Sequence, residues 1–218
     1  MTDKPADTNK VDTSPAPTPG RGRPRNVAVD AAVLRAGWEV LAVAGYTGLT
    51  FEAVAEHAGC SRPALYRRFA NKRDLVLELI RTAAREFRPD VDEEADPRHA
   101  LIEHLKAYVR YLKDSGGAVM LALSQARRAD PLLSQALDEL FISERHHFVR
   151  ALDAAGPTPP DVIDILIDVL LGAVSFRVAL CDGEIADAEI EEIVDMTLHR
   201  ARALSPTGGP AGRRLQSA

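Results

Sequence analysis

Two short amphipathic segments meet at Gly59, in the stretch that runs from Thr50 to Lys72. The second segment, from Ser61 to Arg73, contains five cationic residues and neither Asp nor Glu. Thr50 and Ser61 have the side-chain chemistry of helix N-caps, and Gly59 tolerates the positive φ that a tight turn needs. In a chain of net charge −5, a short helix that gathers cations is suited to contact a polyanion. The pattern predicts a helix-turn-helix motif, and therefore contact with DNA.

The side chains of this motif, residues 50–69, divide into two faces. Ala55 is small enough for a close crossing of the two helices, and Leu65 places an apolar side chain in the core. The inner face is completed by Val54, Ala58, Cys60 and Phe69. The positions expected to face outward are Arg62, Pro63, Ala64, Tyr66, Arg67 and Arg68. A helix that is apolar inside and basic or aromatic outside fits the major groove of DNA, although a purely structural helical hairpin has the same spacing.

The rest of the chain has helical spacing, and no segment shows sustained strand alternation. Caps, glycines and prolines divide it into nine helices and predict an all-α fold. Two of these helices belong to the motif, and one lies between Gly116-Gly117 and Asp130-Pro131. The other six are expected at about 27–44, 72–87, 97–114, 131–155, 160–181 and 187–204. Residues 1–20 and 205–218 lack periodicity, and their composition is typical of disordered tails.

Charge is unevenly distributed along the chain. Residues 21–88 contain 12 basic and 7 acidic side chains, whereas residues 89–200 contain 10 basic and 22 acidic ones. The first part is therefore suited to binding phosphate groups, and the second part would repel them. The positive part coincides with the helix-turn-helix motif.

The composition favours a cytoplasmic protein. The two cysteines, Cys60 and Cys181, are far apart and do not form a disulfide framework. Cys60 falls on the inner face of the motif, where the role of a buried apolar side chain is favoured over that of a redox sensor. The N-terminus has no apolar signal region, and charged residues interrupt the most apolar stretch, 163–181.

The stretch from about Ala28 to Ile80 resembles the DNA-binding domain of the TetR (tetracycline repressor) family of bacterial transcriptional regulators. The matching residues are Gly45-Tyr46, Thr50, Ala55, Leu65-Tyr66, Phe69 and Asn71-Lys72. The resemblance covers about a quarter of the chain and implies a DNA-binding domain over 27–72. It also implies an effector-binding and dimerisation domain over 73–204.

The resemblance assigns DNA contacts to individual residues. Thr50 would cap the first helix of the motif and contact a phosphate, and Lys72 would bind another phosphate. Bases would be faced by Ser61, Arg62, Pro63 and Ala64, while Tyr66 and Arg67 would reach the backbone or base edges. Arg62 is the best candidate for base readout because a guanidinium can pair bidentately with guanine. For each of these residues a plain exposed side chain is the alternative, and Arg68 is expected to face solvent or phosphate.

A basic segment precedes the first helix, at residues 21–26. Its sequence RGRPR resembles the core of an AT-hook, an extended arm whose arginines enter a narrow minor groove. The arginines in question are Arg21, Arg23 and Arg25. A basic linker without groove contact is the alternative.

The C-terminal half has features expected of a dimer. The 160–181 helix is apolar nearly all round and must be buried on two sides, one of which another subunit can supply. The 187–204 helix offers an apolar stripe that comprises Ile190, Ile193, Val194, Thr197, Leu198 and Ala201. The resemblance implies a homodimer in which these two helices form a four-helix bundle. The recognition helices of such a dimer would read a pseudo-palindrome.

The remaining helices can enclose a small-molecule cavity. The residues expected to line it are Tyr108, Tyr111, Met120, Leu121, Gln125, Phe141, Arg145, Phe148 and Phe176, with ordinary core as the alternative for each. Burial of Arg145 would require an anionic or carbonyl partner. The mechanism that the resemblance implies is a population shift in which an effector releases a repressor from its operator. A hundredfold loss of operator affinity requires about 2.7 kcal/mol of coupling.

Motifs of catalysis or metal binding were not found, so we expect no enzyme activity, no cofactor and no metal. GxSxG, GxxxxGK[ST], GxGxxG after a strand and HExxH are all absent from the sequence. His146 and His147 are adjacent on a helix and point about 100° apart. His99 and Glu103 have i,i+4 spacing but no evident third ligand nearby. Two further functions stay open: an architectural DNA-binding protein without an effector, and a helical module whose basic helix binds an acidic protein.

Overall fold

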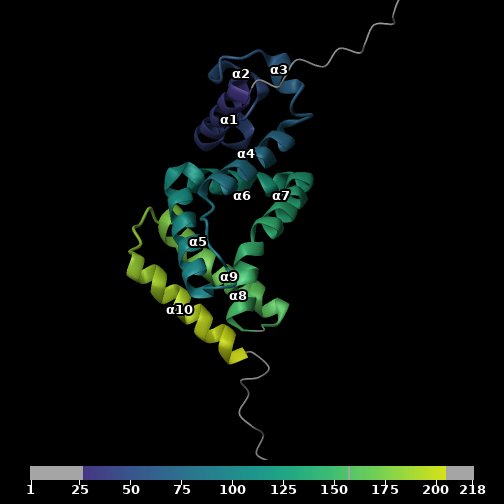
Figure 1. Ribbon diagram of the computed structural model, residues 1–218. Coiled ribbons are helices and arrows are strands. Elements are labelled where there is room, and N and C mark those ends of the chain that lie inside the picture. The colour runs from purple at the N-terminus through teal and green to yellow at the C-terminus, as the bar shows by residue number, and fades with distance from the viewer. Residues whose placement is uncertain (1–26, 157, 205–218) are drawn as a thin grey trace, which may run out of the picture.

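The computed structural model describes residues 27–156 and 158–204, and all regular structure in this part of the chain is helical (Figure 1). The predicted all-α fold is confirmed. The arm at 21–26 and the two predicted tails lie outside the described residues. Within the described part, no helix is long and apolar enough to cross a lipid bilayer.

Three helices form the N-terminal unit at the top of Figure 1: α1 (Val27–Gly48), α2 (Phe51–His57) and α3 (Arg62–Tyr66). Gly45 bends α1 with a φ of 67°, the left-handed conformation expected there. Gly59, with a φ of 62°, makes the turn between α2 and α3. A Cβ at Gly59 would meet no atom within 4 Å, so this turn needs the backbone freedom of glycine rather than its small size.

Local hydrogen bonds start two of these helices as predicted. The Oγ1 of Thr50 accepts a bond of 3.1 Å from the amide of Ala53 and caps α2. Asn71 Oδ1 accepts from the amide of Asp74 at 3.0 Å, while Asn71 Nδ2 donates to Asp74 Oδ2, and this pair starts α4 (Lys72–Phe87). Ser61 occupies the N-cap position of α3, but its side chain makes no cap hydrogen bond.

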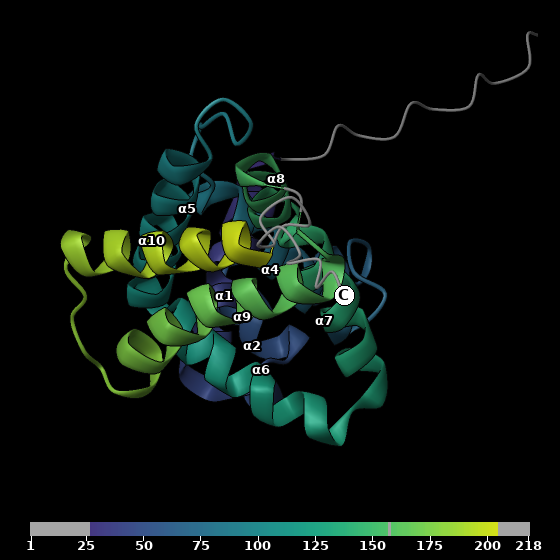
Figure 2. The ribbon, with the colours of Figure 1, turned by 90° about the horizontal axis from the view of Figure 1, so that it is seen from below.

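Six further α-helices and two π-helical turns complete the described chain. They are α5 (Pro97–Tyr111), η1 (Leu112–Gly116), α6 (Gly117–Ala129), α7 (Pro131–Glu144), α8 (His146–Ala155), α9 (Pro160–Val174), η2 (Ser175–Leu180) and α10 (Asp187–Leu204). The bounds of α4 and α10 agree with those predicted. In Figure 2, α9 and α10 lie side by side, and Figure 1 shows both in the half of the molecule away from α2 and α3.

Two predicted boundaries are wrong. The 131–155 helix is broken at Arg145 into α7 and α8, so the described chain has ten α-helices rather than nine. The break expected at Gly116-Gly117 lies instead at Asp114 and Ser115, where Ser115 has a φ of 71°. Gly117 has a packing role, because a Cβ there would lie 3.1 Å from the Cβ of Ala179 in η2.

Two hydrophobic cores hold these helices together. The first joins α1, α2, α3 and α4 to α6 and α7. Its fully buried members are Val33, Leu41, Leu49, Val54, Leu65, Leu75, Val76, Val119, Leu133 and Leu137. The second core joins α5, α8, α9 and α10. The first core therefore contains residues from both sides of the domain boundary predicted between residues 72 and 73.

The outward orientation predicted for Ala64 and Arg68 is wrong. Ala64 is buried, with 8% of its surface exposed. The guanidinium of Arg68 forms an ion pair with Asp30 of α1 and donates to the carbonyl of Ala64 at 2.9 Å. Because its side chain is 20% exposed, Arg68 fastens the end of α3 to α1 and is not free to reach DNA.

We expect Arg68→Ala to lower the free energy of unfolding by about 1–2 kcal/mol, because it removes a partly buried charged hydrogen bond. The neighbouring exposed residue provides a matched control, and Arg67→Ala should change stability by no more than about 0.5 kcal/mol. Urea denaturation of both variants measures the difference. Equal stabilities would contradict the role assigned to Arg68.

Candidate nucleic-acid interface and buried cavity

The outer face of α3 is exposed and polar. Arg62 and Arg67 project from it, and Ser61 and Pro63 are exposed at its start. Arg62 Nη1 lies 3.1 Å from Glu52 Oε1, but both side chains are about half exposed. A surface ion pair of this kind contributes little, so Arg62 can exchange Glu52 for another acceptor at low cost.

Tyr66 lies on the same face and is fixed by an aromatic contact. Its ring meets Phe51 edge to face, with 4.7 Å between the ring centroids. Phe51 is buried, whereas Tyr66 is 59% exposed. Six of the residues that the sequence assigns to DNA are exposed on the motif: Thr50, Ser61, Arg62, Pro63, Tyr66 and Arg67. Ala64 is buried and Lys72 is only partly exposed.

Lys72 is held more tightly than the sequence suggests. Its Nζ donates a hydrogen bond of 2.8 Å to the carbonyl of Tyr46 and lies 4.1 Å from the centroid of the Tyr46 ring. Burial lowers the pKa of Lys72, and Asp130 opposes this shift. The arm residues Arg21, Arg23 and Arg25 lie outside the described part of the chain, so their groove contacts stay a prediction.

Tyr46 connects the N-terminal unit to α7. Its hydroxyl donates to Asp130 Oδ2 at 3.4 Å. Asp130 in turn caps α7 by accepting a bond of 2.9 Å from the amide of Leu133. Burial, followed by the charge of Asp130, raises the pKa of Tyr46, so this hydroxyl keeps its proton. A polar path thus runs from Lys72 through Tyr46 to the start of α7.

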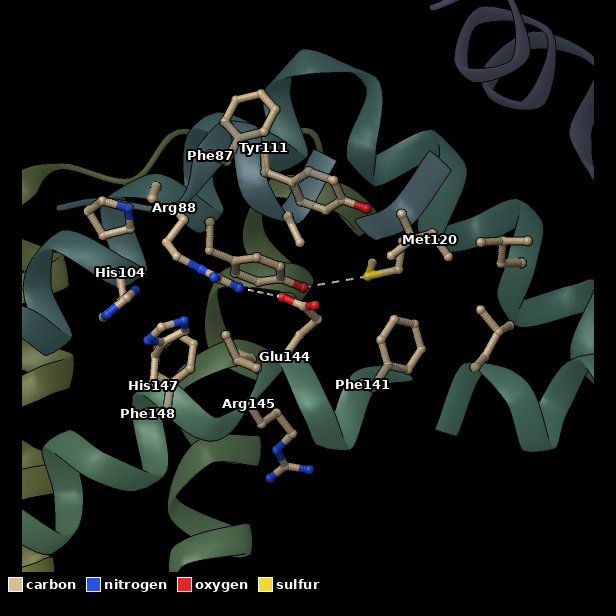
Figure 3. Close-up of a pocket in the computed structure, with 18 of the residues that line it drawn as sticks. Phe87, Arg88, His104, Tyr111, Met120, Phe141, Glu144, Arg145, His147 and Phe148 are labelled. Carbon is tan, nitrogen blue, oxygen red and sulfur yellow. Dashed lines mark hydrogen bonds and ion pairs between the residues drawn. The ribbon is translucent and has the colours of Figure 1, made fainter. Parts of the chain in front are cut away.

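Below the N-terminal unit lies a cavity of about 420 Å³ (Figure 3). Its walls come from α4 to α9, and most of its lining atoms are carbon. The lining residues are Ile80, Ala84, Phe87, Arg88, Pro89, His104, Ala107, Tyr108, Tyr111, Met120, Leu123, Ser124, Arg127, Leu137, Phe141, Glu144, Arg145, His147, Phe148 and Leu171. A cavity of this size and lining is suited to a drug-sized apolar molecule.

The structure gathers most of the predicted lining residues around this cavity. Those present are Tyr108, Tyr111, Met120, Phe141, Arg145 and Phe148. Leu121, Gln125 and Phe176 were also expected, but they lie elsewhere with exposed side chains. The spacing of apolar residues gives the phase of a helix but not which of two neighbouring spaces each face meets.

The polar groups of the cavity are largely satisfied within the protein. Arg88 Nη2 lies 2.9 Å from Glu144 Oε2. The Tyr108 hydroxyl lies 2.8 Å from Ser175 Oγ, and burial raises its pKa. Burial also raises the pKa of Tyr111, so both phenols are neutral. The cavity therefore offers aromatic surface and few free charges.

Arg145 lines the wall, but its guanidinium points away from the cavity (Figure 3). It donates a hydrogen bond of 2.9 Å to the carbonyl oxygen of Asp164 and lies 3.2 Å from the carboxylate of Asp168. The expected carbonyl and anionic partners are thus supplied by α9, within the chain itself.

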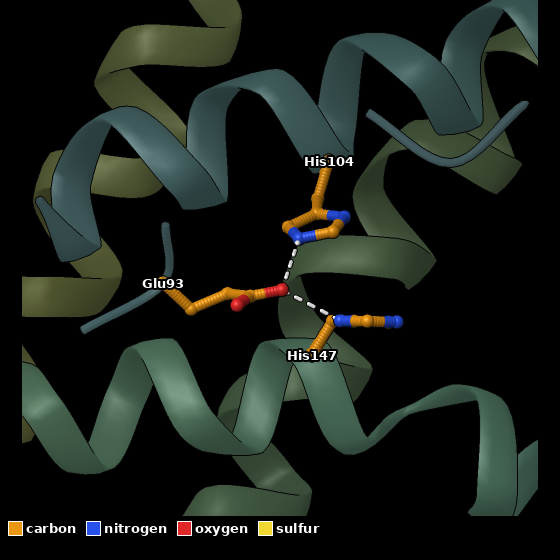
Figure 4. A group of neighbouring side chains, drawn as sticks. All are labelled: Glu93, His104 and His147. Atoms are coloured by element: carbon orange, nitrogen blue, oxygen red, sulfur yellow. Dashed lines mark hydrogen bonds and ion pairs between the residues drawn. The ribbon is translucent and has the colours of Figure 1, made fainter. Parts of the chain in front are cut away.

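Two imidazoles of the cavity wall, those of His104 and His147, lie on either side of the carboxylate of Glu93 (Figure 4). Glu93 Oε1 lies 3.3 Å from His104 Nε2 and 2.6 Å from His147 Nδ1. Burial alone would raise the pKa of Glu93, but hydrogen bonds from His147, its own amide and His104 outweigh it and hold the pKa at about 2. The pKa values of both histidines are lowered, mainly by burial.

Sequence reasoning did not find this cluster. Glu93 belongs to the loop between α4 and α5, His104 to α5 and His147 to α8. The three positions have no motif spacing, and only the packing of α5 against α8 brings them together. The prediction that His146 and His147 point about 100° apart is wrong, because their ring centroids lie 3.7 Å apart. His146 Nδ1 lies 2.6 Å from the carbonyl oxygen of Ser143 and does not bind Glu93.

Comparison with known proteins identifies both halves of the chain. Residues 33–79 match the family described as "Bacterial regulatory proteins, tetR family". Residues 91–197 match the family described as "Tetracyclin repressor-like, C-terminal domain". Together these matches cover the helix-turn-helix unit and most of the helices that enclose the cavity.

Individual relatives agree with this assignment. The chain is similar to the crystal structure of the TetR family transcription regulator SCO0332, with 30% identity, a TM-score of 0.58 and coverage of 84% of this chain and 99% of that one. The uncharacterized HTH-type transcriptional regulator YdeS of Bacillus subtilis (strain 168) is 23% identical over 86% of this chain and 96% of its own length. The flavonoid-responsive regulator FrrA shares the fold at 19% identity and a TM-score of 0.62, over 83% of this chain and 98% of that one. The chain belongs to the TetR family of bacterial transcriptional regulators, which bind DNA through a helix-turn-helix and are not enzymes.

Proposed function

We propose that the protein is a homodimeric repressor that a small apolar molecule releases from a pseudo-palindromic operator. The observation that supports this most directly is the position of α4. Ile80, Ala84 and Phe87 of α4 line the cavity, while Leu75 and Val76 of the same helix are buried in the core beneath the recognition helix. A molecule that fills the cavity therefore pushes against α4, the helix that packs beneath the recognition helix α3.

A second wall of the cavity leads to the same core. Leu123 of α6 and Leu137 of α7 face the cavity and also pack in the first core. Protein cores are close-packed, so a displaced helix moves its neighbours rather than compressing them. A coupling of about 2.7 kcal/mol is sufficient to weaken operator binding a hundredfold.

The effector that fits this cavity is a planar aromatic molecule with few charges. Phe87, Tyr111, Phe141 and Phe148 surround the space, and Arg88 is already paired with Glu144 (Figure 3). Aromatic walls favour stacked or edge-to-face contacts with a ring. The name of FrrA, a protein of the same fold, describes a response to flavonoids, which are molecules of this kind.

The proposed dimer interface lies on α9 and η2. Ile165, Val169, Phe176 and Leu180 are each more than half exposed along these two elements, and Met196 of the neighbouring helix α10 is exposed as well. Contiguous apolar side chains on a protein surface mark an interaction site. A two-fold pairing at this end places two copies of α3 at the opposite end, where they can read two half-sites.

The part of α10 in this interface stays a prediction, but its apolar stripe is not on the surface. Its predicted apolar stripe is buried inside the chain, where Ile190, Val194, Leu198 and Ala201 pack in the second core. The apolar contribution of α10 to a partner subunit is therefore Met196, and the main apolar face belongs to α9 and η2.

The repressor function is tested on DNA upstream of the protein's own gene. Footprinting should show salt-sensitive protection with two-fold symmetry, and a library of aromatic compounds should contain members that abolish it. Protection without a response to any compound would favour an architectural protein. If salt-sensitive binding is absent, the basic helix serves another partner, and the proposal is wrong.

Arg62→Ala should weaken binding to that site by about 1–3 kcal/mol and relax the choice of base at one position in each half-site. The reason is that a guanidinium at the start of a recognition helix can pair with guanine. Fluorescence anisotropy with a set of single-base variants of the site measures both effects. Arg128→Ala, an exposed arginine on α6, is the control and should bind like the wild type.

The double variant Ile165→Glu/Val169→Glu should convert the dimer to monomers, because it places charges in the centre of the apolar face. Light scattering coupled to gel filtration measures the mass. Ile142→Glu, at a highly exposed residue of α7, is the matched control and should leave the dimer intact. A dimer that survives the double variant would exclude the α9 face as the interface.

A further inference from the structure

The cluster of Glu93, His104 and His147 has the arrangement of a metal-binding site. The three side chains come from three separate segments and converge on one point, as Figure 4 shows. Each offers one donor atom, and these atoms all lie within 4.8 Å of one another. Neighbouring donors around a tetrahedral Zn²⁺ lie about 3.3 Å apart, as follows from bond lengths of about 2.0–2.2 Å. Shifts of less than about 1 Å would bring the donors to these positions.

The local structure holds each donor in place. Asp92 Oδ1 accepts hydrogen bonds of 3.0 Å from the amides of Glu94 and Ala95. The turn closed by these bonds contains Glu93 and restricts its backbone. His104 is in the middle of α5, and its ring stacks on that of His147 with 5.1 Å between the centroids. The donors are therefore positioned by the fold before any ligand arrives.

The guanidinium that pairs with the buried carboxylate of Glu93 is shared with a second carboxylate. Glu93 is 8% exposed, and the guanidinium that approaches it, from Arg150, is 3.6 Å away and also pairs with Glu94 at 3.1 Å. Arg88, which lies nearby, is paired with Glu144. A buried anion needs a compensating charge, and a divalent ion between the three donors would provide it.

We propose that Glu93, His104 and His147 bind one divalent transition-metal ion of the Zn²⁺ class. Two imidazoles and one carboxylate suit Zn²⁺, Co²⁺, Ni²⁺ or Fe²⁺, whereas Mg²⁺ and Ca²⁺ prefer sites made of oxygen atoms. Three protein ligands leave at least one coordination position open. The proposal does not depend on the repressor function, because it concerns only binding of the ion.

The open position has access to the cavity. His104 and His147 both line the cavity wall, so an ion can enter there and water or an effector atom can complete its coordination. His147 Nε2 is buried without a hydrogen-bond partner in the described part of the chain. When Nδ1 binds the ion, this nitrogen carries the proton and can donate it to a molecule in the cavity.

The direct test is a Co²⁺ titration of the full chain, without an affinity tag and after treatment with a chelator. One Co²⁺ per chain should bind, with visible absorption bands of a four- or five-coordinate ion. Zn²⁺ should displace it, since Zn²⁺ binds such sites more tightly. A large excess of Mg²⁺ should leave the spectrum unchanged.

Three variants locate the site. Glu93→Gln, His104→Gln and His147→Gln should each weaken Co²⁺ binding by more than about tenfold, the lower bound for changes even in outer-shell partners. His99→Gln, an exposed histidine on the same helix as His104, is the control and should bind Co²⁺ like the wild type.

Zn²⁺ should also raise the melting temperature of the wild type and of His99→Gln, but not that of His147→Gln. The proposal is overturned if natively folded wild-type protein gives no saturable Co²⁺ spectrum, or if all three ligand variants bind as tightly as the control. Because the wild-type titration decides the first point alone, a variant that fails to fold does not leave the question open.

Discussion

The packing of α6 and α7 against α1 and α4 determines how the rest of this protein is arranged. Leu133 and Leu137 of α7 are fully buried in the same core as Val33 and Leu41 of α1. The helix-turn-helix is thus built on helices that belong, in sequence, to the C-terminal half. Removing α6 and α7 would expose the apolar side of the helix-turn-helix unit, so one shared core stabilises the two halves of the chain.

This shared core places the cavity between two different surfaces, the polar face of α3 and the apolar face of α9 and η2. Above it, α3 presents Arg62 and Arg67 on the exposed side of the motif. Below it, α9 and η2 expose the apolar face that we assign to a second subunit. The coupling that we propose between the cavity and α3 rests on α4, which lines the cavity and also packs in the core under α3.

Local signals predicted much of this fold, and tertiary contacts account for what they missed. Caps located the starts of α2 and α4, because the side chains of Thr50 and Asn71 accept hydrogen bonds from amides of the helices that they begin. The break at Arg145 has no proline or glycine to mark it. The prediction of Phe176 in the cavity is wrong because a helix that is apolar all round does not reveal which side faces inward. The Glu93 cluster depends on contacts among three distant segments, which periodicity does not encode.

Operator affinity of the Ala84→Trp variant tests most directly whether a filled cavity displaces the recognition helix α3. Ala84 lines the cavity from α4, so the indole would act as a tethered effector. We expect at least about tenfold weaker operator binding by a variant with native helicity and dimer mass, while Ala154→Trp, on the exposed side of α8, binds normally. Wild-type affinity in a folded Ala84→Trp protein would show that filling the cavity does not displace α3.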